Sequence, residues 1–397
     1  MKFSNKAMEI NPSITLEITA KAKELKELGV DITSFGAGEP DFNTPSNIIK
    51  AATLAMENGK TKYTATSGIL ELRQAICNKL KKENNLDYDP SQIIISTGAK
   101  QGLANTFLSI LNPGDEVIIP TPYWVSYPEL VKIAGGIPVY CNSKRENDYK
   151  YTLEELEEVL SYKTKAIVIN SPNNPTGSIY DRDELENIAA FARKNDILII
   201  SDEIYEKLIY DGEKHISIAS LSEDALNRTI IINGLSKSYA MTGWRIGYSA
   251  SNKEIAKLMS SIQSHMTSNA SSISQYGALE ALTGDQDSVD YMVKEFDNRR
   301  KYMINRIREM KDISIIKPKG AFYIMVDISN YYGKSYNGKV IESSLDFAKQ
   351  ILEKEKVAVI PGIGFGLDKY IRLSYATSME VIEKGLDRIE KFIKDIK

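Results

Sequence analysis

Short runs of apolar, mostly β-branched residues alternate with longer amphipathic stretches through the middle of the chain. The runs are continuous rather than alternating, which is typical of strands covered on both faces of a sheet. Between residues 183 and 194, apolar residues recur on one side at helical spacing. This order of elements predicts an α/β fold, with a mostly parallel sheet covered by helices on both faces. The runs expected as strands are residues 93–96, 116–119, 165–169, 196–200 and 229–232.

The two ends of the chain have a different pattern, which predicts a smaller α+β domain. Residues 14–28 have helical periodicity that ends at Gly29, a typical C-terminal cap. Thr44 followed by Pro45 is typical of a capping residue and a proline at the first helical position. The elements expected near the C-terminus are a long charged helix after residue 285, strands at 321–326, 357–360 and 370–374, and an amphipathic helix over 382–396.

The length of the chain, 397 residues, is too great for one simple core and predicts two domains. We expect a large domain over residues 46–285. The small domain is expected to combine residues 1–45 with residues 286–397, because both ends share the α+β pattern.

Composition and charge exclude several classes of function. The chain is 42% apolar and 26% charged, as in ordinary globular proteins, and its net charge of −3 argues against a nucleic-acid partner. No window approaches the roughly 18 apolar residues of a membrane span, so we expect no membrane partner. Cys77 and Cys141 lack CxxC spacing, which favours a reducing, cytoplasmic compartment. His215 and His265 match no metal motif, and no metal is expected.

Polar and reactive residues follow four of the expected strands. In parallel sheets ligands bind outside the carboxyl ends of the strands, so these positions are candidates for one site. Gly98, Ala99 and Lys100 form a small-residue turn before a helix, whose free N–H groups favour an anion. The other strands are followed by Asn174, by Asp202 and Tyr205, and by Ser236, Lys237 and Arg245.

Lys237 is the most informative of these residues, because a lysine directly after a buried strand is unusual. A desolvated lysine becomes a nucleophilic amine that can form a Schiff base, and Arg245 is a cation suited to a phosphate. This pairing indicates pyridoxal 5'-phosphate. The other needs of that cofactor are met by Asp202 for the ring nitrogen, Asn174 and Tyr205 for the phenolic oxygen, Gly98, Ala99, Lys100 and Ser236 for the phosphate, and Trp124 for stacking on the ring.

Each of these residues also has an ordinary structural explanation when taken alone. Lys237 could lie on the surface at a helix start, Asp202 could cap a helix, and Asn174 could be a turn residue. Those explanations must all hold at once, at the ends of successive strands. We therefore favour the cofactor site.

Seven segments, in the same order, give the chain a resemblance to a known family. The sequence resembles a class I aminotransferase of fold type I, in the bacterial aspartate aminotransferase subgroup, along nearly its whole length. The segments that carry this resemblance are residues 36–42 (GAGEPDF), 63–73, 171–177 (SPNNPTG), 201–206 (SDEIYE), 236–245, 320–323 and 372–376.

The resemblance implies roles that spacing alone does not give. Arg372 would bind the α-carboxylate of the amino acid, with Trp124, Asn174 and the backbone of Gly38 beside the substrate. Tyr63 would reach the cofactor phosphate of the other subunit, which implies a homodimer. The implied reaction is ping-pong transamination between an L-amino acid and a 2-oxo acid. In it, Lys237 links to the cofactor, then removes and returns the α-proton, while Asp202 keeps the ring protonated.

We expect aspartate as the donor and 2-oxoglutarate as the acceptor, following the subgroup. Residues 11–15 (NPSIT) carry asparagine at position 11, where several relatives have a basic residue, so an alanine- or aromatic-preferring enzyme stays an alternative. A second alternative is a carbon–sulfur β-lyase that uses the same residues. A regulator built on this fold would carry an added DNA-binding domain, and the family pattern begins too near the N-terminus for that reading.

Overall fold

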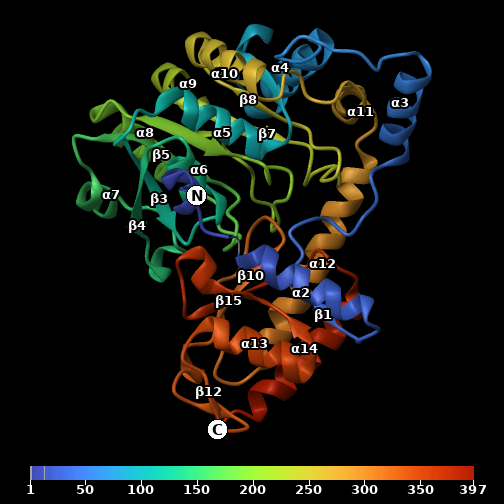
Figure 1. Cartoon of the computed structure of the whole chain (residues 1–397), viewed down its shortest axis with the longest axis vertical. Coiled ribbons are helices and arrows are strands. Elements are labelled where there is room, and N and C mark those ends of the chain that lie inside the picture. Colours follow the sequence, from blue (N-terminus) through green and yellow to red (C-terminus); the bar gives the residue numbers. More distant parts are fainter. Residues whose placement is uncertain (1, 13) are drawn as a thin grey trace.

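The computed structural model describes residues 2–12 and 14–397, which form a broad upper part and a narrower lower part (Figure 1). Within these residues, a seven-stranded sheet lies at the centre of the upper part, in the order β2-β8-β7-β6-β5-β3-β4. Strands β7 to β4 are parallel to one another, whereas β8 is antiparallel to both of its neighbours. The strand bounds are β2 (Ile93–Ser96), β3 (Glu116–Thr121), β4 (Ile137–Asn142), β5 (Thr164–Asn170), β6 (Leu198–Asp202), β7 (Thr229–Gly234) and β8 (Gly247–Ala250).

Helices cover both faces of this sheet, as the sequence predicts. Successive strand residues point to opposite faces, and both sets are buried. Val117 and Ile119 pack in the cluster that contains α5, α6 and α10, whereas Ile118 and Ile167 pack in the cluster that contains α7 and α8. The helices of the upper part are α3 (Ser46–Glu57), α4 (Leu70–Asn84), α5 (Ala99–Ile110), α6 (Ser126–Ile133), α7 (Leu153–Val159), α8 (Arg182–Lys194), α9 (Glu223–Arg228), α10 (Lys253–Met266) and α11 (Ser272–Thr283).

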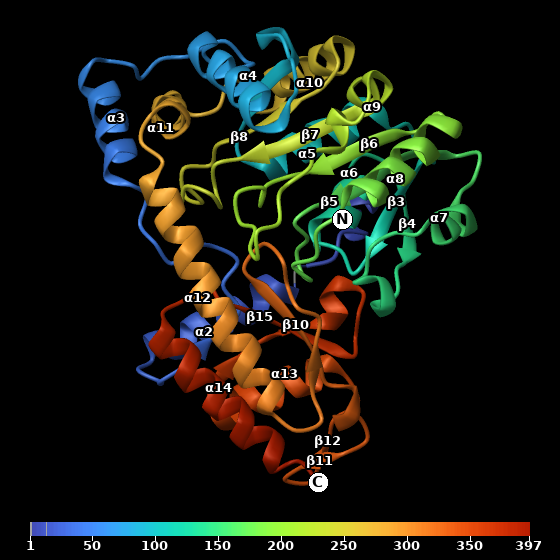
Figure 2. The same ribbon diagram turned by 180° about the vertical axis from the view of Figure 1, so that it is seen from behind.

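The lower part contains a four-stranded antiparallel sheet in the order β14-β15-β10-β9. Residues from both ends of the chain meet there, because β1 (Thr33–Ser34) pairs with β13 (Val357–Ala358). Helix α12 runs from the upper part into the lower part (Figure 2). The other elements are α1 (Asn5–Met8), α2 (Ile14–Glu27), α12 (Asp287–Glu309), β9 (Ser314–Ile315), β10 (Tyr323–Asp327), β11 (Ser335–Tyr336), β12 (Lys339–Val340), α13 (Ser344–Glu355), β14 (Ile360–Pro361), β15 (Tyr370–Ser374) and α14 (Met379–Lys394).

The structure corrects three details of the predicted elements. The strand expected at 357–360 is divided into β13 and β14, which belong to different sheets. Thr44 does not cap α3, because its hydroxyl donates a 2.7 Å hydrogen bond to the carbonyl of Ala240 and accepts one from Trp244, and the helix begins after Pro45. Strands β4 and β8 were not expected, since neither is a continuous apolar run. The domain bounds proposed from the sequence stay a prediction. None of the described helices combines the length and apolar character that a membrane crossing needs.

Candidate active site

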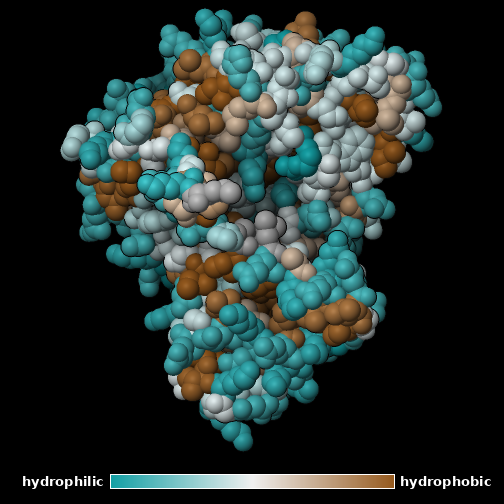
Figure 3. All heavy atoms as spheres, in the orientation of Figure 1, coloured by the Kyte–Doolittle hydropathy of each residue, from teal (hydrophilic) through white to brown (hydrophobic). Residues whose placement is uncertain are grey.

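The carboxyl ends of β3, β5, β6 and β7 open on a cavity of about 750 Å³ between the two sheets. Polar residues gather in a hollow between the upper and lower parts (Figure 3). Because parallel strands end at the same edge, the loops that follow them converge on one site. The predicted residues that line this cavity are Gly38, Ala99, Lys100, Trp124, Asn174, Asp202, Tyr205, Ser236, Lys237, Arg245 and Arg372.

Asp202, the last residue of β6, is a buried carboxylate at the floor of the cavity. It accepts a 2.7 Å hydrogen bond from the hydroxyl of Tyr127 and a 3.2 Å bond from the backbone N–H of Ile204. Burial raises the pKa of Asp202 to about 6, although these two hydrogen bonds act in the opposite direction. A cationic ligand in the cavity would therefore stabilise the ionised form of Asp202.

Lys237 lies three residues after β7, and its amine reaches back to the N-terminal loop. Its Nζ donates a hydrogen bond to the carbonyl of Gly38. Burial lowers the pKa of Lys237 to about 8, with Arg372 and Arg245 acting in the same direction and Glu39 opposing them. Such an amine is partly neutral near physiological pH, as a nucleophile and a general base require.

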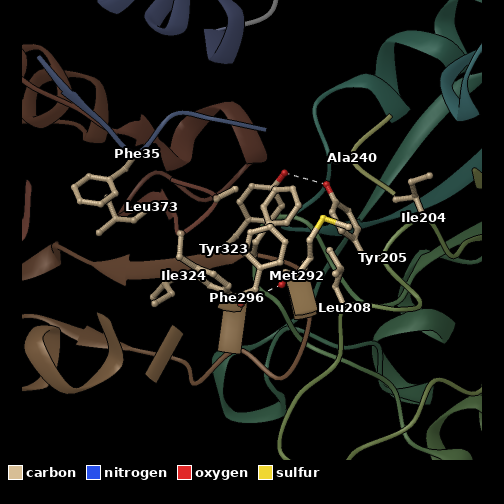
Figure 4. Packing of buried hydrophobic residues seen from close by; sticks show 14 of the residues in the cluster. Phe35, Ile204, Tyr205, Leu208, Ala240, Met292, Phe296, Tyr323, Ile324 and Leu373 are labelled. Atoms are coloured by element: carbon tan, nitrogen blue, oxygen red, sulfur yellow. Dashed lines mark hydrogen bonds between the residues drawn. The ribbon is translucent and has the colours of Figure 1, made fainter. Parts of the chain in front are cut away.

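Tyr205 and Tyr323 join the two sheets at the cavity. Their hydroxyls lie 2.9 Å apart in a hydrogen bond, and their rings pack edge to face (Figure 4). Burial raises the pKa of Tyr205 well above its usual range, so the phenol stays protonated. Tyr205 can therefore donate a hydrogen bond to an anionic oxygen bound beside it.

Arg372, on β15, is buried and bonded to protein through only part of its guanidinium group. Its Nη1 donates a 2.9 Å hydrogen bond to Oδ1 of Asn174, and its Nη2 lies 3.4 Å from the carbonyl of Gly36. Its Nε has no partner among the described residues, and the group stacks on the rings of Tyr323 and Phe365. A buried guanidinium without a carboxylate partner is suited to an anionic ligand.

Gly98 and Arg245 lie together at the other end of the cavity. Gly98 precedes α5 with φ +79°, and a Cβ there would lie 2.5 Å from Nη2 of Arg245, so only glycine leaves room for the guanidinium group. The exposed Arg245 and the first turn of α5 thus offer a cation and free backbone N–H groups to one anion. Lys100 is the second residue of α5, with its Nζ 5.0 Å from the ring centroid of Trp124.

Among the predicted residues, Gly98 does not itself line the cavity but lies beside Arg245, whereas Tyr63 lies away from both. Its side chain is 91% exposed, on the segment between α3 and α4. A second hollow of about 850 Å³ adjoins the first and shares Glu39, Thr242, Gly243 and Arg245 with it. Tyr63 lines neither hollow of its own chain.

Sequence reasoning missed two tyrosines that contact the predicted site residues. Tyr127 lies in the first turn of α6, three residues after Trp124, and bonds to Asp202. Tyr323 begins β10 and bonds to Tyr205. For Tyr127 the helical spacing from Trp124 was an available signal, whereas Tyr323 is brought to Tyr205 only by the packing of the two sheets.

Comparisons with known proteins show which family the chain resembles. The family model for "Aminotransferase class I and II" matches residues 30–389. The chain is 51% identical to an aspartate aminotransferase of Bacillus sp. (strain YM-2), covering 99% of both chains, and 48% identical to a probable aspartate/prephenate aminotransferase of Rickettsia bellii, covering 98% of both. The crystal structure of an aspartate aminotransferase from Rhizobium meliloti superposes with a TM-score of 0.96 at 38% identity, covering all of both chains. This chain therefore belongs to the class I and II aminotransferases.

Proposed function

We propose that this chain moves an amino group from L-aspartate to 2-oxoglutarate through a pyridoxal phosphate linked to Lys237. The observation that carries the proposal is the meeting of Lys237, Asp202 and Arg372 at one cavity. The amine suits the aldehyde of the cofactor, the carboxylate suits its ring nitrogen, and the guanidinium suits the carboxylate of an amino acid. When bound, the cofactor supplies the electron sink that lets the amino acid lose its α-proton.

The residues at the cavity fit this cofactor. Asp202 has no ion pair with any described residue, and a protonated ring nitrogen would provide one. Oδ1 of Asn174 is committed to Arg372, so its Nδ2 is the atom left to donate, together with Tyr205, to the phenolic oxygen. At the phosphate end, Ser236 and Arg245 join the backbone turn from Gly98 to Lys100, and Trp124 offers its ring for stacking.

Lys237 moves the proton in the proposed mechanism. In the cofactor-free protein its Nζ is partly neutral, because burial lowers its pKa to about 8. This amine would hold the cofactor through its aldehyde until an amino acid takes its place. The freed Nζ would take the α-proton of the amino acid as a base and give it back as an acid. Release of the first oxo acid before 2-oxoglutarate binds in the same site would give ping-pong kinetics, with Lys237 acting in the reverse order.

Arg372 orients the substrate in both halves of the cycle. Every amino acid and every 2-oxo acid substrate carries the same carboxylate, which a guanidinium group can bind through two parallel hydrogen bonds. Asn174 holds the guanidinium by the 2.9 Å bond at Nη1, and Tyr323 and Phe365 stack on it, so the group is fixed before the substrate arrives. The backbone of Gly38 lies beside the same carboxylate in this proposal.

Lys100 favours a substrate with a second carboxylate. It lines the cavity, burial lowers its pKa, and it forms no ion pair with any described residue. Arg372 serves the α-carboxylate and Arg245 the phosphate, so Lys100 is left to meet a distal carboxylate such as that of aspartate. Asn11 forms hydrogen bonds with Glu129 and does not line the cavity, so the absence of a basic residue at position 11 is weak evidence against a dicarboxylate substrate. Ser13, in the same segment, lies outside the described residues.

Tyr63 completes the site from a second subunit in this proposal. Its exposure fits a residue that acts across an interface, and the hollow beside Arg245 has room for a segment of another chain. We thus propose a homodimer in which Tyr63 contacts the partner's cofactor phosphate. A cytoplasmic location accords with the two free cysteines.

The test is a panel of amino donors with 2-oxoglutarate, in which each oxo acid is followed separately. We expect aspartate to have the highest kcat/KM, with oxaloacetate and glutamate formed in equal amounts. A preference for alanine or an aromatic donor would replace aspartate in the proposal but leave transamination standing. Formation of pyruvate and ammonia from cystathionine, without any oxo acid acceptor, would instead support the β-lyase and contradict the proposal.

A further inference from the structure

A buried polar network lies behind the Asp202–Tyr205 turn, on the side away from the cavity. The turn is helical in shape, with the N–H of Glu206 bonded to the carbonyl of Glu203 at 2.9 Å. At this spacing, Asp202 and Tyr205 share one face and Glu203 and Glu206 share the other. The first pair lines the cavity, whereas the second pair does not.

Glu203 is 1% exposed and is held by three side chains. Its Oε1 accepts hydrogen bonds from Ser201 at 3.0 Å and Ser217 at 2.6 Å, and its Oε2 lies 3.0 Å from Nε2 of His215. Burial alone would lower the pKa of His215, but the carboxylates of Glu203 and Glu206 outweigh it and raise that pKa. Protonation of His215 would give Glu203 a counter-charge at 3.0 Å.

Glu206 connects the turn to two other elements. Its carboxylate accepts hydrogen bonds from Lys79 on α4, from Asn84 at 3.2 Å and from Asn233 at 2.8 Å. Asn233 belongs to β7, the strand that leads to Lys237. Glu206 therefore ties the turn that carries Asp202 to the strand that carries the reactive lysine.

The ligand atoms of Glu203, Glu206 and His215 lie within 4.8 Å of one another, a spacing that a metal ion could also use. The ammonium group of Lys79 already provides a cation at Glu206, and the side chains of both are less than a tenth exposed. Every carboxylate oxygen of Glu203 and Glu206 has a protein donor. Both carboxylates are thus satisfied without a metal, whereas Nδ1 of His215 is buried and has no hydrogen-bond partner among the described residues. The burial of these charged side chains beside the site therefore calls for another explanation.

We propose that Glu203 and Glu206 are positioning residues for the transamination. They hold the turn so that Asp202 and Tyr205 face the cavity at a fixed separation from Lys237. Asp202 would have to contact the ring nitrogen of the cofactor while Lys237 links to the aldehyde on the same ring. The distance between these two side chains must therefore be fixed to within a fraction of an ångström. The inference rests on the proposed roles of Asp202 and Lys237.

The experiment compares Glu206→Gln and Glu203→Gln with the matched control Glu213→Gln, whose side chain is 40% exposed and paired with Lys319 at the surface. Pyridoxal phosphate is titrated into cofactor-free protein to obtain Kd, and the loaded protein gives kcat, KM for aspartate and the pH midpoint of the visible absorbance. For the two buried variants we expect Kd to rise and kcat to fall by about tenfold or more, with a shifted midpoint and a nearly unchanged KM. The control should match the wild type in all four quantities.

A purely structural network would give a different result. Folded Glu206→Gln would then have a lower Tm but the Kd, kcat and absorbance midpoint of the wild type, and the proposal would be overturned. If Glu206→Gln does not fold because Lys79 is left unpaired, the double variant Lys79→Met/Glu206→Gln removes that charge and is judged in the same way, with Glu203→Gln as the independent second case. Asp202→Asn separates the two proposals. If this variant binds pyridoxal phosphate and turns over normally, the proposed function fails. If it loses both properties while Glu206→Gln keeps them, only the proposed role of the network is refuted.

Discussion

The hydroxyl of Tyr127 donates a 2.7 Å hydrogen bond to the carboxylate of Asp202, and both side chains are buried. This bond stabilises the ionised carboxylate, yet burial still raises the pKa of Asp202 to about 6. Tyr127 thus orients the Asp202 carboxylate but does not fully offset the free-energy cost of burying its charge. A protonated ring nitrogen bound in the cavity would remove that cost, which links cofactor binding to the stability of the fold.

Asp202→Asn is therefore expected to stabilise the cofactor-free protein at neutral pH. The folded protein holds the Asp202 proton more tightly than the unfolded chain does, with a pKa of about 6 against 3.8, so stability falls as pH rises through this range. The variant, which has no such titration, should gain roughly 3 kcal/mol above about pH 6 and nothing below about pH 4. Thermal unfolding of both proteins at a series of pH values measures the difference. Saturating pyridoxal phosphate should reverse the order, and a variant that is less stable at every pH would contradict the account.

Lys237 should react with the cofactor at an unusually low pH. Only the neutral amine is nucleophilic, and the lysine is half neutral near pH 8 instead of near 10.5. The rate at which added pyridoxal phosphate links to the cofactor-free protein should rise with pH and level off above about 8, as followed by stopped-flow absorbance. Lys237→Ala should lose both this absorbance change and turnover. A rate that keeps rising to pH 10 would mean that the amine is not desolvated.

Arg372→Lys tests whether the fixed guanidinium group is needed. Lysine keeps the charge but cannot form two parallel hydrogen bonds or accept the same stacking on Tyr323. We expect kcat/KM to fall by about 10²-fold for every amino donor, because each loses one charge-assisted bond and the alignment it gives. Kinetics with aspartate and alanine side by side measure this, and a loss confined to aspartate would show that Arg372 binds the distal group instead.

The polar groups at the strand ends were predictable, because a parallel sheet brings successive carboxyl ends to one edge whatever the details of packing. Lys237, Asp202 and Asn174 were found in this way. Tyr323 was not, since it meets Tyr205 only where two sheets from distant segments pack together. Glu206 resembles a surface carboxylate in the sequence, and only the fold brings Lys79, 127 residues away, to pair with it.

Lys100→Met should change the choice of substrate rather than the binding of the cofactor. Loss of one charge-assisted hydrogen bond to a distal carboxylate should raise KM for aspartate by about tenfold or more and leave KM for alanine unchanged. Lys163→Met is the control, because Lys163 also lies over an aromatic ring, that of the exposed Tyr162. If Lys100 instead binds the phosphate, as the sequence first indicated, the variant will show a raised Kd for pyridoxal phosphate with all donors affected alike.

Tyr63→Phe tests whether the active site is shared between subunits. Loss of a hydroxyl that bonds to the phosphate should raise the Kd of pyridoxal phosphate by about tenfold, the usual value of a hydrogen bond to a charged group. The sharper experiment mixes chains carrying Tyr63→Phe with chains carrying Lys237→Ala, after dissociation and reassembly. In a mixed dimer, the site with intact Lys237 receives Tyr63 from the other chain, so wild-type affinity should return at half of the sites.

Each parent homodimer provides its own control for this mixture. Lys237→Ala alone should show no turnover, and Tyr63→Phe alone should show only weak cofactor binding, so activity at low cofactor concentration can come only from mixed dimers. Because Tyr63 is 91% exposed in the single chain, a contribution within its own subunit would require its segment to fold back over Arg245. In that case mixing would restore nothing, and the shared site would have to be abandoned.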